Sequence, residues 1–191
     1  NLVRLGMDLV WIGFESKDCD AYAKNAGIDA RQMVRDLRDR GISVLASGIL
    51  CSEQHTAETV KEELDYLVSL QADLVQFMLF TALPVTQLYQ DFKTGGTLRT
   101  SLPFEEWHGQ KHLNYRHPEF PGDAPERILN LAFRQDYEVN FSSIYRTSET
   151  VVRGYRTLAA RPNRDACLEA RLGQMAQKVR TYCQLLPLVV R

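Results

Sequence analysis

Apolar stretches of about strand length alternate with amphipathic segments through the first half of the chain. The stretches cover residues 8–14, 42–50 and 72–80, and Val, Ile, Leu and Phe occupy both of their alternating faces. Apolar side chains on both faces are typical of strands that are covered on both sides in a parallel sheet. The pattern therefore predicts buried parallel strands at these positions.

The segments between these strands have the apolar periodicity of amphipathic helices. Asp29 is the expected N-cap of a first helix, and Gly41 is expected to end it. Thr56 is the expected N-cap of a second helix that reaches Gln71. This order of strands and helices describes consecutive βαβ units with right-handed crossovers. Periodicity does not separate a doubly wound sheet from a TIM-like barrel, and in both folds ligands bind beyond the C-terminal strand ends.

The second half of the chain carries no further strand pattern. Residues 94–122 are predicted as loop, because glycines and prolines recur there with Trp and His between them, and a loop this long is usually functional or mobile. Asp123 to Glu126 have the sequence of a capping box with Pro in the first turn. A long helix is expected to follow toward Phe141.

These patterns divide the chain into three parts. Helices are also expected near residues 147–160 and 163–185. The parts are a βαβαβα unit at 1–93, an aromatic- and histidine-rich loop at 94–122, and a helical tail at 123–191.

Composition narrows the function classes. The net charge of −1 comes from interspersed acids and bases, so nothing indicates a nucleic-acid or membrane-surface partner. No apolar run approaches the roughly 18–20 residues that span a bilayer, and no signal peptide is visible. We expect a cytoplasmic protein. Because the chain begins with Asn1 inside an apolar run, without Met, we also expect it to be cut from a longer protein.

The cysteines predict no metal site. Cys19, Cys51, Cys167 and Cys183 lie far apart in the sequence, so no zinc or iron–sulfur ligand pair is visible. Reduced thiols are the expectation in the cytoplasm. Cys51 lies at a strand end, where it is either a nucleophile or a buried small thiol.

Polar residues gather at the predicted strand ends. Glu15 and Ser16 follow the first strand, Ser52 and Glu53 follow the second, and the run 81–86 follows the third. Because parallel strands end at one edge of the sheet, these residues are expected to lie together at the opening of one ligand site. Their alternative role is ordinary capping of the following loops. Lys24, a helical turn or two further on, is either a site residue or a surface lysine.

Histidines in the loop raise a second possibility. His108 and His112 would share one helix face, as zinc ligands do. However, Gly109 weakens a helix there, and neither histidine has the adjacent catalytic Glu of zinc proteases. We therefore expect these histidines to pack the loop or to contact substrate, with residues 103–120 as a lid on the substrate side.

The strand ends, taken in order, resemble a known family. The string is GMDLVWIGFES…YAKNAGID…LRDRGISVLASGILCSEQHTAET…ADLVQFMLFTALPVTQLYQD…HGQKHLNYRHPEF. Over about residues 1–120 it is similar to the C-terminal half of radical S-adenosylmethionine (SAM) enzymes. It looks closest to the branch whose members carry an N-terminal cobalamin-binding domain. The resemblance implies an α/β fold, half of a partial (β/α)6 TIM-like barrel with parallel strands four to six, and a helical C-terminal tail.

The resemblance also implies site residues. In that family, polar residues at the end of the fourth strand contact the ribose or the methionine part of SAM. A basic residue shortly after them contacts the methionine carboxylate, and the fifth and sixth strands flank the adenine. The matching positions here are Glu15, Ser16, Lys24, Ser47, Gln76 and Met78. The chain departs from the family at Cys51, where Gly is usual, and at Pro84-Val85-Thr86, where Pro-Gly-Thr is usual; lost glycines remove positive-φ conformations.

The larger departure is the absence of the family's three-cysteine motif, which holds its [4Fe–4S] cluster. The implied parent enzyme would use SAM and that cluster, and in this branch cobalamin, on an unknown small-molecule substrate. The chain alone would be inactive, and its partner would be the missing N-terminal half of the barrel. The rival interpretation is a non-catalytic α/β binding or scaffold module derived from the same barrel. An open first strand further predicts homo-oligomers of the isolated chain.

Overall fold

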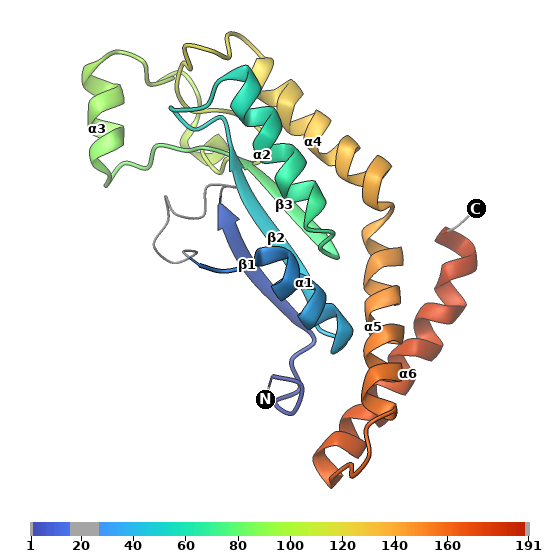
Figure 1. Cartoon of the computed structure of the whole chain (residues 1–191). Coiled ribbons are helices and arrows are strands. Elements are labelled where there is room, and N and C mark those ends of the chain that lie inside the picture. The colour runs from blue at the N-terminus through green and yellow to red at the C-terminus, as the bar shows by residue number, and fades with distance from the viewer. Residues whose placement is uncertain (1, 16–26, 190–191) are drawn as a thin grey trace.

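The fold is an α/β arrangement built on a parallel sheet, as predicted. The computed structural model describes residues 2–15 and 27–189, and its sheet has the strand order β1-β2-β3. The strands are β1 (Leu9–Glu15), β2 (Ser43–Leu50) and β3 (Leu74–Leu79), and both strand pairs are parallel. Figure 1 shows the strands running together toward the end of the molecule that carries α3. The consecutive βαβ units predicted from periodicity are confirmed.

Helices cover one face of this sheet. Helix α1 (Ala30–Asp39) and helix α2 (Ala57–Ser69) pack on the face that carries Val44, Ala46 and Phe77. Helix α4 (Ala124–Asn140) joins them, and its Phe133 contacts Phe77 edge to face at 5.2 Å. The three helices and this face of the sheet bury the core.

The opposite face of the sheet has no such layer among the described residues. Its side chains alternate with the core set, and Leu45, Ile49 and Met78 are only partly buried while Trp11 is 61% exposed. The prediction that the strands are covered on both faces is therefore wrong for this chain by itself. The sequence records that a side chain is apolar, but not which element covers it.

In the first half of the chain, helices α1 and α2 begin at the N-cap residues that the sequence predicts. Asp29 accepts a hydrogen bond from the Gln32 backbone N–H at 2.9 Å and caps α1. The chain leaves α1 through Gly41 at φ +74°, a conformation that glycine adopts without a Cβ penalty. Thr56 caps α2 in a reciprocal capping box with Thr59.

The capping box predicted at Asp123 to Glu126 does not form. Asp123 is the N-cap of α4, but its side chain makes no capping hydrogen bond. Its carboxylate pairs instead with the Arg127 guanidinium, one helical turn away. A charged partner at this spacing competes with the backbone N–H groups, so the sequence signature alone misassigned this side chain.

The remaining helices form the predicted tail. The tail consists of α4, α5 (Ser143–Ala159) and α6 (Ala166–Val189). It follows the short helix α3 (Gln87–Thr94) and a 3-10 turn (Phe104–Glu106). Helix α5 starts earlier than expected because the Ser142 hydroxyl accepts from the Tyr145 N–H at 3.2 Å. Figure 1 shows α5 and α6 side by side below α4, away from the strand ends near α3.

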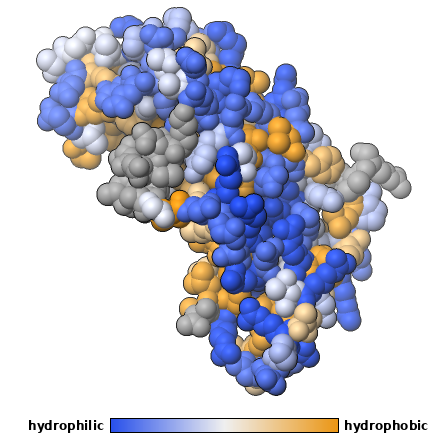
Figure 2. Space-filling model, viewed as in Figure 1, coloured by the Kyte–Doolittle hydropathy of each residue, from blue (hydrophilic) through white to orange (hydrophobic). Residues whose placement is uncertain are grey.

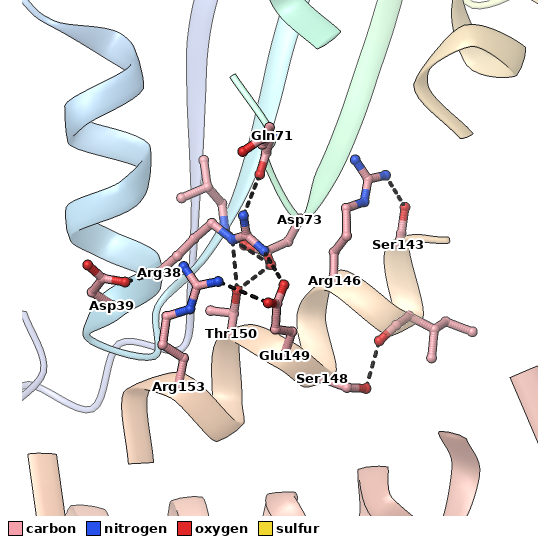
Figure 3. A network of polar contacts seen from close by, with 12 residues as sticks. Arg38, Asp39, Gln71, Asp73, Ser143, Arg146, Ser148, Glu149, Thr150 and Arg153 are labelled. Atoms are coloured by element: carbon pink, nitrogen blue, oxygen red, sulfur yellow. Dashed lines mark hydrogen bonds and ion pairs between the residues drawn. The ribbon is translucent and has the colours of Figure 1, made fainter. Parts of the chain in front are cut away.

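A buried polar network joins α5 to α1 and to the sheet (Figure 3). Asp73 is fully buried at the start of β3 and accepts hydrogen bonds from the Val44 N–H at 2.9 Å and the Thr150 hydroxyl at 2.6 Å. Arg38 of α1 lies 3.3 Å from Asp73 and donates to Thr150 and to the Gln71 carbonyl. This network lies at the N-terminal ends of the strands, opposite the edge at which parallel α/β sheets bind ligands.

Candidate functional site

A cavity of about 610 Å³ opens at the C-terminal ends of the strands. Its floor comes from all three strands through Glu15, Ser47 and Met78, and its wall comes from the 94–122 loop through Trp107 and His108. This volume lies within the range of about 300–1,000 Å³ typical of small-molecule sites. Glu15 and Thr81, at the ends of β1 and β3, line this one cavity as predicted, but Ser52 and Glu53, after β2, do not line it.

The cavity gathers several of the predicted site residues and leaves others out. Glu15, Ser47, Met78 and His108 line it. Gln76 pairs with Ser47 in the sheet register, on the same face, but does not line the cavity. Ser16 and Lys24 lie outside the described residues, so their predicted roles stay predictions.

His112 does not reach the cavity, so of the two roles expected for the loop histidines, loop packing and substrate contact, it takes the first. Its Nδ1 is 2.9 Å from the Glu126 carboxylate at the start of α4, and it is absent from the cavity lining. Gly109 separates the two histidines with φ +71°, and its carbonyl accepts from the Leu79 N–H at 2.6 Å. The chain therefore turns sharply between His108 and His112, so they do not share a helix face.

Both tryptophans of the chain line this cavity, and Trp11 is not among the predicted site residues. The indole N–H of Trp11 donates to the Ser47 hydroxyl at 2.9 Å. The indole N–H of Trp107 donates to the Leu102 carbonyl at 3.0 Å, and its ring lies 5.9 Å from Tyr89. Strand alternation could have found Trp11, because residues two apart share a face and Trp11 precedes Gly13 and Glu15. For Trp107, the sequence predicts only that its loop, residues 103–120, lies on the substrate side.

Two strand ends adopt a left-handed backbone. Glu15 has φ 59° and Cys51 has φ 56°, a region that non-glycine residues enter at a cost of about 1 kcal/mol. The resemblance places Gly at the Cys51 position, and the conformation found there is one that glycine favours. These turns bend the chain sharply where each strand ends.

Cys51 is a buried thiol and not a nucleophile. Its side chain is fully buried, and burial raises the pKa of the thiol to about 12. Because the thiolate is the reactive form, such a thiol is inert near neutral pH. Of the two roles left open by the sequence, the structure supports packing.

The loop that forms the cavity wall is tied down by buried polar side chains. Asn114 is fully buried and bonds both the N–H and the carbonyl of Ala82, at 3.1 and 2.8 Å. The Tyr115 hydroxyl donates to the Cys51 carbonyl at 2.7 Å, and His117 Nε2 lies 2.8 Å from the Ser52 carbonyl. The stretch is a loop, as predicted, with one short 3-10 turn, and non-local hydrogen bonds order it against the strand ends.

An iron–sulfur cluster does not fit the described part of the chain. No three His, Cys, Asp or Glu side chains within residues 2–15 and 27–189 come together as metal ligands. Cys51 is buried, while Cys167 and Cys183 are exposed on α6. Cys19 lies outside the described residues. Over the same ranges, no helix has the length and apolarity needed to cross a membrane.

The fold and the cavity define an α/β protein with a ligand-sized site at the C-terminal edge of a parallel sheet. No known family model matches the sequence, and no curated protein matches it either.

Proposed function

We propose that the chain is the C-terminal part of the catalytic barrel of a radical SAM enzyme and that SAM binds in the strand-end cavity. The observation that carries the proposal is the convergence of Glu15, Ser47 and Met78, from three different strands, on one cavity. The resemblance assigned SAM contacts to these same positions. A carboxylate, a hydroxyl and apolar walls suit a ligand that combines a ribose, an amino acid and a flat base.

SAM supplies the reactive group in such enzymes. The protein binds and orients SAM and the substrate, and it excludes water from the site. In this proposal Glu15 accepts hydrogen bonds from the ribose or methionine part, and Met78 packs against the adenine. Because the cluster ligands do not fit the described residues, the chain contributes binding but cannot by itself complete the reaction. The rest of the barrel would have to supply the cluster.

Glu15→Gln tests this assignment. SAM binding should quench tryptophan fluorescence, because both tryptophans line the cavity. The substitution should weaken binding by about 1–3 kcal/mol, the usual range for a hydrogen bond to a charged group. Fluorescence titration of the isolated chain measures it. Glu53→Gln, at the end of β2 but outside the cavity lining, is the matched control and should bind SAM like the wild type.

Two outcomes would count against the proposal. A folded chain that does not bind SAM would favour the non-catalytic scaffold. Equal affinities for Glu15→Gln and wild type would remove Glu15 from the site.

The open side of the sheet supports a further barrel segment as partner. Among the described residues, β1 pairs only with β2, so its other edge is unpaired. Beside that edge, an apolar groove of about 610 Å³ runs between β1 and α1, lined by Val10, Ile12, Met33 and Leu37. Figure 2 shows apolar side chains at this place, next to the hydrophilic outer surface of the helices. A parallel strand with its helix would fill the edge and the groove together.

The isolated chain should therefore associate with itself. Unpaired strand edges and exposed apolar side chains favour pairing, most simply as a twofold dimer through β1. Light scattering at micromolar concentration should give about twice the chain mass of 21.9 kDa. Trp11→Lys places a charge on the exposed edge and should yield monomers. Val85→Lys, at a side chain 95% exposed elsewhere, should leave the dimer intact. A monomeric wild type would contradict this prediction.

A further inference from the structure

A second cavity, of about 420 Å³, lies between the ordered loop and the start of α4. None of its lining residues lines the strand-end cavity. Two arginines, Arg99 and Arg116, contribute to its wall together with the rings of Tyr115, His117 and Phe120. The chemistry of this cavity is therefore distinct from that of the strand-end site, which has no arginine or lysine among its described lining residues.

The two arginines are held in place by the backbone. Leu98 and Tyr115 form an antiparallel bridge, so Arg99 and Arg116 come from adjacent paired segments. The Arg99 guanidinium donates to the Leu113 carbonyl at 2.9 Å, and the Arg116 guanidinium donates to the Gly96 carbonyl at 3.2 Å. A guanidinium carries five N–H donors, so each arginine keeps donors for a ligand while its position is fixed.

Charge balance selects a singly charged anion. Glu126 is the carboxylate that pairs with Arg99, at 3.6 Å, and it also contacts His112. Arg116 has no ion-pair partner among the described residues. The described lining carries two guanidinium groups and no carboxylate, and with Glu126, the ion-pair partner of Arg99, the arginine pair keeps a single positive charge to compensate. A carboxylate ligand matches this balance, whereas a phosphate dianion would exceed it.

The other residues of the cavity wall favour a ligand whose uncharged part is apolar or aromatic. Tyr115 and Phe120 are buried, and the His117 ring lies between them, with centroid distances of 5.8 and 4.6 Å. Two hydrogen bonds fix the His117 ring: its Nδ1 accepts from the Glu119 N–H at 3.1 Å, and its Nε2 lies 2.8 Å from the Ser52 carbonyl. The rings offer packing area for a flat group, beside donors for its charged end.

We propose that this cavity binds an organic monocarboxylate with an aromatic or apolar body. The proposal is independent of SAM binding, because it concerns different residues. It predicts recognition of the carboxylate by Arg99 and Arg116 and of the body by Tyr115 and Phe120.

Benzoate is the probe that tests it. Titration of the whole chain, followed by ¹H–¹⁵N spectra, should shift the backbone amides of Arg116 and Gly122 and should saturate. Arg116→Gln should weaken benzoate binding at least tenfold, and neutral benzamide should bind the wild type at least tenfold more weakly than benzoate. Arg116 is exposed, so this variant should fold. Arg180→Gln, on the exposed surface of α6, is the control and should change nothing.

Glu126→Gln gives a test with the opposite sign. The substitution removes the carboxylate that competes for Arg99, so benzoate should bind about threefold or more tightly. The proposal is overturned by any of three results. These are no saturable shifts around Arg116 and Gly122, equal binding by Arg116→Gln and wild type, and binding of inorganic phosphate more tightly than benzoate.

Discussion

Arg38→Met should lower the free energy of unfolding by about 3–5 kcal/mol, the usual loss when one partner of a buried ion pair is removed. Arg38 donates hydrogen bonds to α5 and to the turn before β3, and it lies beside the fully buried Asp73 (Figure 3). Without the guanidinium, Asp73 keeps its hydrogen bonds from Val44 and Thr150 but loses its adjacent cation. Urea unfolding measures the loss.

Arg153→Met is the matched control. Arg153 also pairs with Glu149, at 3.0 Å, but its side chain is 38% exposed, and its other partner, Asp39, is 52% exposed. Exposed ion pairs contribute about 0–1 kcal/mol, so this variant should lose less than about 1 kcal/mol. Equal losses for the two arginine variants would show that burial of the network does not set its energy.

The penalty for Arg38→Met should depend on pH in a defined direction. Burial raises the pKa of Asp73 above its ordinary value of 3.8, although Thr150 and Arg38 oppose the rise. A carboxyl with a raised pKa contributes most to stability below the unfolded-state value and loses this contribution as pH rises through the folded-state value. Removing Arg38 raises the pKa of Asp73 further, because a nearby cation no longer favours the ionised form.

The loss should therefore be larger at pH 7 than at pH 4, where Asp73 can take up a proton. Adding Asp73→Asn to Arg38→Met should recover part of the stability at pH 7, because it removes the uncompensated charge. A penalty that is the same at both pH values, or a double variant less stable than Arg38→Met, would contradict this account.

Gly154→Ala should destabilise the protein, although alanine is the better helix former. A Cβ at Gly154 in α5 would lie 2.1 Å from the Gly41 Cα and 2.3 Å from its nitrogen, so a backbone segment would have to move. Overpacking of this kind costs about 1–3 kcal/mol or more, which exceeds the gain of about 1 kcal/mol from helix propensity. We expect a net loss of about 2 kcal/mol, measured as a lower midpoint in thermal or urea unfolding.

Gly173→Ala is the control, and it should have the opposite sign. Gly173 lies inside α6, and a Cβ there would meet no atom within 4 Å. The substitution should therefore stabilise the protein by about 0.5–1 kcal/mol, through helix propensity alone. If both variants shift stability in the same direction, the close contact between Gly154 and Gly41 does not limit the packing of α5.

Much of the candidate site could be predicted from strand order. Glu15 and Met78 reach one cavity because parallel strands in consecutive βαβ units end at the same edge, which is a property of topology. Trp107, in contrast, could be predicted only as part of a loop on the substrate side, and its position in the cavity wall could not. Its place depends on the loop, which Asn114 and Tyr115 fix through hydrogen bonds to residues more than 30 positions earlier in the chain.

The sequence by itself determined the strands, the capped starts of α1 and α2, and the parallel order of the sheet. These features depend on side-chain alternation and on hydrogen bonds between residues a few positions apart. Only the tertiary structure decided how Asp73 meets Thr150, 77 residues away, and which carboxylate Arg99 and His112 share. The physical reason is desolvation: a polar side chain has to find its partner where distant elements exclude water, and no local pattern specifies which elements meet.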